Sequence, residues 1–334
     1  MLFYGKVIII MRLSDEQLRA LSNAGQLHDA WKEVMSRLSR MPGGMYWRVI
    51  NSREYLYEYV STSGKQQTKY VGAKTPELEN TFREFKETRA DLDARRAGIE
   101  ARLAEVAPMW RALRLPAIDT TAGRILRAFD IGDFLGSNLL VIGTYALKAY
   151  EVEAAATFST GMDATDDLDF TVLIDQAKPD ADLPRRLLLT LKQEDSSFIV
   201  STASAKTLVN KNGYKIDLLT STEYAKALAS AMPWKPQGLE GQEWLVLGKP
   251  VQTVLIDFQG RPVAIAAPDP RYFALHKLWL GKRPGRPRAK AVKDENQGRA
   301  LLQAIKEYMP HYPLDEKFVA QLPRELKVQM TGDW

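Results

Sequence analysis

Two short apolar segments of this chain carry carboxylates in positions that strongly constrain its fold. In the run TDDLDF at 165–170, Asp167 and Asp169 alternate with apolar residues. Alternate side chains of a β-strand point to opposite faces, so both acids share one face and the apolar side chains enter the core. Two carboxylates on one face repel each other unless a cation lies between them. The pattern is therefore typical of a Mg²⁺ site for phosphoryl transfer.

A third acid lies inside the later apolar run YKIDLL at 214–219, where Asp217 shares a strand face with Lys215. A charge within a central strand needs a partner, because its desolvation is costly. We expect the first two acids and their metal to supply it. The alternative is that all three acids are solvated edge-strand charges or members of salt bridges.

The scarcity of Cys and His limits which metals and nucleophiles this protein can use. The chain has no Cys and three His, namely His28, His276 and His311, which are far apart in the sequence. Disulfides, thiolate nucleophiles and cysteine-ligated zinc or iron–sulfur sites are excluded. A metal in this protein is therefore expected to be a hard cation held by carboxylates.

A glycine turn precedes the acidic strand. Val141 and Ile142 end a predicted strand, Gly143 and Thr144 follow, and a helix is predicted after them. Backbone N–H groups and a hydroxyl at a helix N-terminus suit a phosphate. Lys277, on a predicted helix at 270–281, is a second candidate phosphate contact; the alternative is that it flanks an apolar helix face.

These motifs carry a resemblance. Their order, Gly-hydroxyl, Asp-x-Asp and a later single Asp, resembles the DNA polymerase β nucleotidyltransferase superfamily. VIGTYALKAY and TDDLDF are similar to bacterial nucleotidyltransferase-like proteins, including toxin and abortive-infection types, and 267–305 resembles their C-terminal helical part. The resemblance covers roughly residues 118–310 and does not reach residues 1–107.

The resemblance implies a role for each matching residue. Asp167 and Asp169 are implied as Mg²⁺ or Mn²⁺ ligands, and Asp217 as the acid that joins the metal and activates the attacking hydroxyl. Contacts to the NTP are implied for Gly143 and Thr144, and we also expect Lys215 and Lys277 to contact the NTP. Gly-Thr stands where the superfamily more often has Gly-Ser. The long gap before Asp167 allows a loop, Thr157–Ala164, that covers the nucleotide.

The net charge is concentrated in one segment. The chain has 46 Lys and Arg against 41 Asp and Glu, and six of the twelve residues at 282–293 are basic and none acidic. We expect a loop here that binds the triphosphate or a polyanion such as RNA. The alternatives are minor-groove binding through the AT-hook-like Gly285-Arg286-Pro287 and a solvated surface loop. The candidate polyanion contacts are Lys282, Arg283, Arg286 and Arg288.

The N-terminal part predicts a separate module. A helix begins at Ser14 and ends before Pro42, and the aromatic and basic residues of 45–72 alternate as in three antiparallel strands. Such a sheet can stack bases, although aromatic residues are also ordinary strand formers. Residues 75–107 follow a heptad pattern up to Pro108, which predicts a long helix that makes a homodimer contact or braces the chain.

We therefore expect an α/β (α+β) protein with a small mixed sheet flanked by helices. The expected parts are the N-terminal module at 1–107, a nucleotidyltransferase core at 118–225 and a C-terminal strand and helical subdomain at 226–334, with a boundary near 108–118. The expected core strands are 139–143, 168–174, 197–201 and 214–220, and helices are expected at 118–135 and 294–309.

The expected activity is Mg²⁺- or Mn²⁺-dependent transfer of a nucleoside monophosphate from an NTP to an acceptor hydroxyl. An RNA end, such as a tRNA 3′ terminus, is favoured. The alternatives are protein nucleotidylation of the AMPylation type and a catalytically silent nucleic-acid-binding protein. The apolar run at 2–10 is too short to cross a bilayer and lacks the flanks of a signal peptide, so a cytoplasmic protein is expected.

Overall fold

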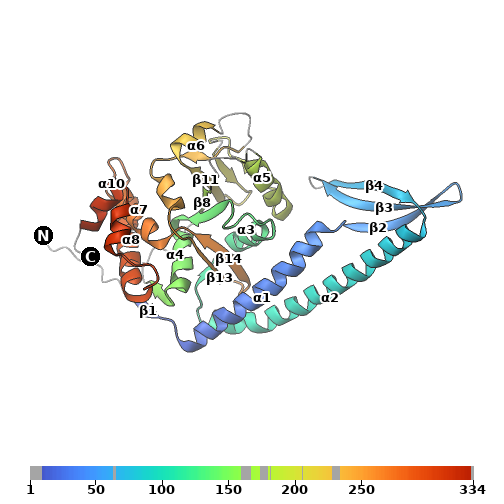
Figure 1. The fold of residues 1–334 in the computed structure, drawn as a ribbon, viewed down its shortest axis with the longest axis horizontal. Coiled ribbons are helices and arrows are strands. Elements are labelled where there is room, and N and C mark those ends of the chain that lie inside the picture. The colour runs from blue at the N-terminus through green and yellow to red at the C-terminus, as the bar shows by residue number, and fades with distance from the viewer. Residues whose placement is uncertain are drawn as a thin grey trace. The chain divides into compact units, whose positions relative to one another are not determined.

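The chain divides into two units, one formed by Gln26–Pro108 and the other by Met1–Gly25 with Met109–Trp334 (Figure 1). The computed structural model describes residues 10–62, 65–158, 167–173, 180, 182–204, 206–227 and 234–331. Two helices, α1 (Asp15–Arg40) and α2 (Pro76–Ala112), run from one unit into the other.

A mixed sheet forms the centre of the larger unit. Its strand order is β6-β8-β11-β10-β9, with β12 alongside β11. The strands β8 and β11 are parallel, as are β11 and β12, whereas the other pairs are antiparallel. The mixed α/β sheet predicted from the sequence is confirmed. The strands are β6 (Leu139–Ile142), β8 (Asp167–Val172), β9 (Ile199–Val200), β10 (Thr207–Val209), β11 (Lys215–Thr220) and β12 (Gln237–Gly238).

The central strands are held by apolar residues on alternate positions. Leu168 and Phe170 of β8, and Ile216 and Leu218 of β11, are fully buried. Their burial leaves the intervening polar residues on the opposite face. The same unit contains the helices α3 (Thr120–Ile131), α4 (Gly143–Glu153), α5 (Leu183–Glu194), α6 (Thr222–Ala227), α7 (Pro270–Gly281) and α8 (Arg288–Tyr308).

A second, smaller sheet of the larger unit combines distant parts of the chain. The hairpin of β13 (Val251–Asp257) and β14 (Pro262–Ala267) takes β5 (Ala117–Ile118) as a parallel third strand. In addition, β1 (Ile10–Arg12) pairs with β7 (Ala156–Phe158). The chain ends with α9 (Glu316–Gln321), α10 (Arg324–Lys327) and the 3₁₀ turn Val328–Thr331; another such turn is Gln242–Val246.

The smaller unit contains the predicted three-stranded sheet. The strands β2 (Gly44–Ile50), β3 (Arg53–Thr62) and β4 (Lys65–Ala73) form an antiparallel meander. Apolar residues of the α2 heptad pack within the unit: Leu92 is fully buried and clusters with Val34 and Leu38 of α1. The heptad seam therefore has a partner helix within the same chain.

Several boundaries differ from the sequence prediction. The helix predicted to end at Pro108 continues to Ala112, because a proline removes only one backbone hydrogen bond and the following turn is anchored by the buried Trp110. The helix predicted from 294 begins at Arg288, so half of the basic segment is helical. The helix predicted at 118–135 is α3, which is shorter at both ends.

Two expectations concern segments that the structure does not describe. The loop predicted to cover the nucleotide, Thr157–Ala164, lies outside the described residues except for Thr157 and Phe158, and the run at 2–10 lies outside except for Ile10. Among the described helices, none has the length and apolar character needed to cross a membrane.

Candidate functional site

The strand register brings the predicted acids together. The parallel pairing of β8 with β11 places Asp169 beside Asp217 and Asp167 beside Lys215. The antiparallel pairing of β6 with β8 places Ile142 opposite Asp169. The glycine turn that follows Ile142 and the acidic strands therefore meet at one end of the sheet.

Gly143 lies directly against the Asp169 carboxylate. Its φ of +70° is in the left-handed region, and a Cβ added here would lie 2.7 Å from Asp169 Oδ2. Only glycine meets both conditions without strain. Since α4 begins at Gly143, its first backbone N–H groups, which lack helical partners, lie at the same end of the sheet.

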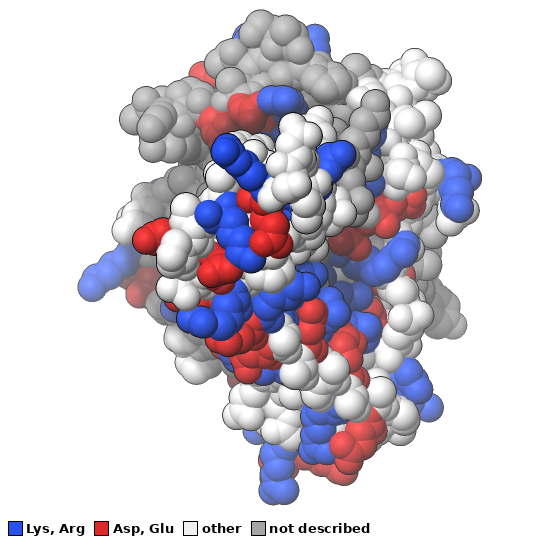
Figure 2. Space-filling model, turned by 90° about the vertical axis from the view of Figure 1, so that its right-hand side faces the viewer, with Lys and Arg blue, Asp and Glu red and all other residues white. Residues whose placement is uncertain are grey.

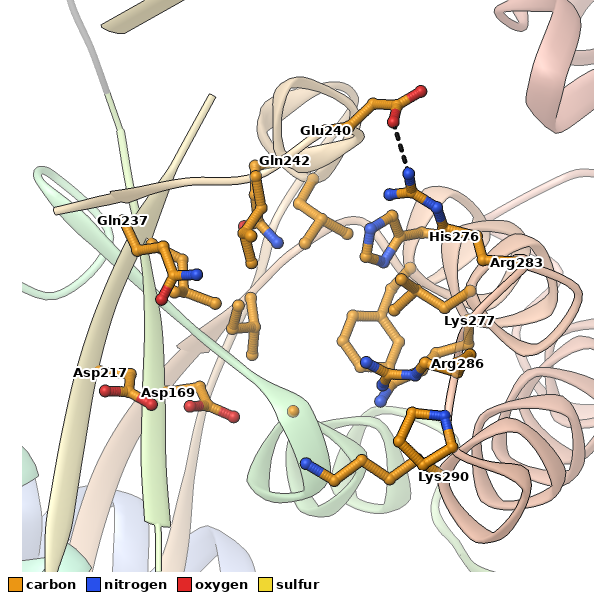
Figure 3. Close-up of a pocket in the computed structure, with 18 of the residues that line it drawn as sticks. Asp169, Asp217, Gln237, Glu240, Gln242, His276, Lys277, Arg283, Arg286 and Lys290 are labelled. Carbon is orange, nitrogen blue, oxygen red and sulfur yellow. Dashed lines mark hydrogen bonds and ion pairs between the residues drawn. The ribbon is translucent and has the colours of Figure 1, made fainter. Parts of the chain in front are cut away.

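A cavity of about 470 Å³ lies in front of these residues. Figure 3 shows Asp169 and Asp217 on one side of it, and Lys277, Arg286 and Lys290 on the other. The volume is within the usual range for small-molecule sites. The sheet contributes the acids, while α7, α8 and the turn between them contribute the cations.

Two of the acids, Asp169 and Asp217, lack a direct partner among the described residues. Burial, followed by repulsion from Asp167 and Asp217, raises the pKa of Asp169 to about 7. Among the described residues, neither Asp169 nor Asp217 has a hydrogen-bond or ion-pair partner, and Asp217 Oδ1 is buried. A bound cation would relieve both the repulsion and the unmet hydrogen-bonding capacity.

The donor set fits Mg²⁺ held jointly with a phosphate. In the described ranges, no group of three or more His, Asp or Glu side chains is arranged to hold a metal by itself. Mg²⁺ is usually bound by one or two carboxylates, with substrate phosphates and water completing its octahedron. Asp169 and Asp217 would supply these carboxylates, and Asp167, at the exposed end of β8, lines the same cavity.

The cationic side is organised by an acid that the sequence analysis missed. Asp294 of α8 is 2% exposed; its Oδ1 lies 2.8 Å from Lys277 Nζ, and its Oδ2 lies 2.9 Å from Arg286 Nε. These contacts hold two predicted phosphate-binding cations in place and neutralise part of their charge. The sequence feature that could have indicated Asp294 is its position, since it is the first acidic residue after the basic segment at 282–293.

The basic segment is not the open loop that the sequence predicted. Arg283 pairs with Glu240, and Lys282 donates to Gln329. Neither Lys282 nor Arg288 lines the cavity. Lys290 does line it, is exposed, and has no ion pair with any described residue.

The remaining charge is spread widely. Figure 2 shows one face of the molecule, on which Lys and Arg side chains are interspersed with Asp and Glu. Charge of both signs in this arrangement gives no broad single-sign field on that face.

Two other predicted nucleotide contacts lie elsewhere. Thr144 lines a second cavity, of about 680 Å³, together with Tyr145 and Lys148. Lys215 is exposed beside Asp167 and does not line the first cavity. The sequence grouped both residues with the site because of their neighbours in the chain.

Amide side chains of the site had no sequence signal. Gln237 of β12 and Gln242 line the cavity and lie above the acids in the view of Figure 3. Gln242 is 5% exposed, and its Oε1 has no hydrogen-bond partner in the described structure. His276 also lines the cavity, and burial lowers its pKa to about 3, so its ring is neutral at pH 7.

A family model described as nucleotidyltransferase matches residues 120–321, which is more than half of the chain. The matched range contains all three acids, the glycine turn and the cationic helices. No curated protein and no solved structure gives a significant match.

Proposed function

Because the chain belongs to this nucleotidyltransferase family, we propose that its cavity binds an NTP with Mg²⁺ or Mn²⁺ and transfers the nucleoside monophosphate to an acceptor hydroxyl of RNA. The acceptor oxygen would bond to the α-phosphorus as the bond to the β-phosphate breaks, and pyrophosphate would leave. The observation that carries this proposal is the opposition of carboxylates and cations across one cavity. Asp169 and Asp217, which have no hydrogen-bond or ion-pair partner among the described residues, lie across it from Lys277, Arg286 and Lys290. A triphosphate with its metal has the complementary charge on each side.

The proposed metal site uses Asp169 and Asp217, and Asp167 lines the same cavity at the exposed end of β8. A bound Mg²⁺ would neutralise charge that develops on the triphosphate oxygens. Asp217 is also assigned the proton of the attacking hydroxyl, because its buried Oδ1 has no hydrogen-bond partner among the described residues.

Phosphate binding is assigned to groups on both sides of the cavity. The backbone N–H groups that begin at Gly143 contact phosphate oxygens, as at other helix N-termini. Lys290, Lys277 and Arg286 line the wall opposite Asp169 and Asp217 (Figure 3). We assign no phosphate contact to the Thr144 side chain or to Lys215, which lie outside this cavity.

A labelling experiment tests the reaction. The full chain is incubated with each α-³²P-labelled NTP, Mg²⁺, total RNA and cell lysate, and RNA and protein are then separated. We expect one NTP to label RNA, and we expect Asp169→Asn to abolish the label. Asp91→Asn, which changes an exposed acid of α2, is the matched control and should retain it.

Each result has a defined meaning. Label on protein would replace RNA with the alternative acceptor, a protein hydroxyl. The absence of label with the unaltered chain, or label that persists in Asp169→Asn, would contradict the enzymatic proposal and favour a nucleic-acid-binding role.

A further inference from the structure

The sheet of the smaller unit has two faces of different chemistry. One face packs on α2: Leu56 is fully buried, Trp47 contacts Phe82 with ring centroids 5.9 Å apart, and Gly72 lies against Leu78. Because side chains alternate along each strand, the intervening residues form the opposite face. That face is called the tyrosine face below.

Five tyrosines occupy the tyrosine face, contributed by all three strands. Tyr46 of β2 lies opposite Tyr57 of β3, which in turn lies opposite Tyr70 of β4. The rings form a continuous contact series: Tyr59–Tyr46 at 4.8 Å, Tyr46–Tyr57 at 5.8 Å, Tyr57–Tyr70 at 5.7 Å and Tyr70–Tyr55 at 6.1 Å between centroids.

The tyrosine rings are accessible. Tyr70 is 53% exposed and Tyr59 is 36% exposed. Gly44 leaves room for the Tyr59 ring, since a Cβ at Gly44 would lie 3.0 Å from that ring. None of the five hydroxyl groups has a hydrogen-bond partner among the described residues. Ordinary core or sheet packing does not require this arrangement of rings.

Charge is sorted between the two faces. Arg48 lies opposite Tyr55, and Arg53 lies opposite Ile50, so both arginines share the tyrosine face. Neither has an ion pair with any described residue. The acids of β3 are on the other face, where Glu54 pairs with Lys74, and Glu58 with Lys69. In the part of the sheet that the structure describes, the tyrosine face therefore combines aromatic rings with cations that have no ion pair, and it carries no carboxylate.

We propose that the tyrosine face binds single-stranded RNA. Unpaired bases stack on aromatic rings irrespective of sequence, and arginines contact the phosphates between them. The absence of carboxylates from the described part of this face is complementary to a polyanion. The choice of RNA as the occupant rests on the proposed function, in which RNA supplies the acceptor hydroxyl.

Direct binding tests this inference. The affinity of the full chain for a fluorescent single-stranded RNA of mixed sequence is measured by anisotropy, without NTP and with EDTA. We expect Tyr70→Ala to weaken binding by about fivefold or more, because one stacking platform is lost. Tyr70→Phe keeps the ring and should bind within about twofold of the unaltered chain.

Salt dependence tests the arginines separately. Each phosphate contact to a single strand contributes about 0.7 to the slope of log affinity against log salt. Arg48→Ala should reduce the slope by about this amount. The control is Arg83→Ala, which removes an arginine from α2 with a hydrogen bond to Asn80 and should leave the slope unchanged. Far-UV circular dichroism confirms that each variant is folded, and the arginine pair still tests the proposal if Tyr70→Ala does not fold.

Several results would overturn the inference. These are equal RNA affinity of the folded Tyr70→Ala variant, an unchanged salt slope in Arg48→Ala, tighter binding of duplex RNA or of single-stranded DNA, and no RNA binding by the unaltered chain. Failure of the proposed function gives a different result. The unaltered chain would then transfer no label in the labelling experiment, while both it and Asp169→Asn would still bind RNA.

Discussion

At the residue scale, the site depends on a contact between a glycine and a carboxylate. Gly143 and Asp169 are 26 positions apart, yet the pairing of β6 with β8 brings them together. The positive φ of Gly143 favours glycine over any residue with a side chain, and the absence of a Cβ leaves room for the Asp169 carboxylate. Backbone geometry and charge placement are therefore coupled at this point.

Replacement of this glycine should affect activity strongly. In Gly143→Ala, the new Cβ collides with Asp169 Oδ2 and displaces either the carboxylate or the first turn of α4. We expect kcat/KM for the NTP to fall by about 100-fold or more, since small misplacements in a catalytic site have effects of this size. The control is Gly98→Ala on α2, where a Cβ meets nothing within 4 Å. It should retain activity and gain about 0.5–1 kcal/mol of stability.

Removal of the Asp169 charge should stabilise the metal-free protein. The pKa of Asp169 is raised from 3.8 to about 7. Between these two pH values the folded chain holds a proton that the unfolded chain has released. The contribution of this group to the free energy of unfolding is therefore fully present below pH 3.8 and is lost as the pH rises through 7. At pH 8 with EDTA, Asp169→Asn should unfold at a higher urea concentration than the unaltered chain, and its free energy of unfolding should be higher by roughly 1–4 kcal/mol. Mg²⁺ with an NTP should raise the Tm of the unaltered chain but not that of the variant. A less stable variant at pH 8 would contradict this account.

At the element scale, helix boundaries decide which basic residues reach the cavity. The helix α8 begins at Arg288 and places Lys290 in the cavity lining, while Arg288 is outside it. Composition predicted a basic segment correctly, but not its helical second half. The reason is that 282–287 contains two prolines and a glycine, which obscured the helix start that follows.

These two residues of α8 give a matched pair of variants. Lys290→Ala should raise the KM for the NTP by about tenfold, because an unpaired cation facing the phosphates is lost. Arg288→Ala should leave KM within about twofold. Steady-state kinetics with saturating acceptor separates the two. Equal effects would indicate that the segment acts through its overall charge rather than through the cavity.

At the scale of the whole molecule, the buried His276 lines the cavity and also makes the stability of the fold depend on pH. Burial, followed by the nearby Lys277 charge, lowers the pKa of His276 to about 3, against 6.5 in the unfolded chain. Between pH 6.5 and 3 the unfolded chain therefore binds a proton that the folded chain does not. Stability from this group is present above pH 6.5 and is lost as the pH falls through this window.

Urea unfolding measured against pH tests this linkage. His276→Gln should lose less stability on acidification from pH 6.5 to 4.5, with a difference in slope of up to about 1.4 kcal/mol per pH unit. His311→Gln replaces an exposed histidine and serves as the control. Parallel curves for His276→Gln and the unaltered chain would show that His276 does not carry this pH dependence.

The sequence by itself determined the chemistry available to the site. The alternation around Asp167 and Asp169, the later Asp217 and the absence of Cys predicted an acidic site on strands that suits a hard cation, because strand periodicity is a local property. The same periodicity predicted the aromatic sheet of the smaller unit.

Only the tertiary structure decided which groups face one another. Strand register placed Asp169 against Gly143 and beside Asp217, and helix packing tied Lys277 and Arg286 to Asp294. It also left Thr144 and Lys215 out of the lining of that cavity. Such pairings join residues far apart in the chain, and packing and hydrogen bonding between elements, rather than local pattern, select them.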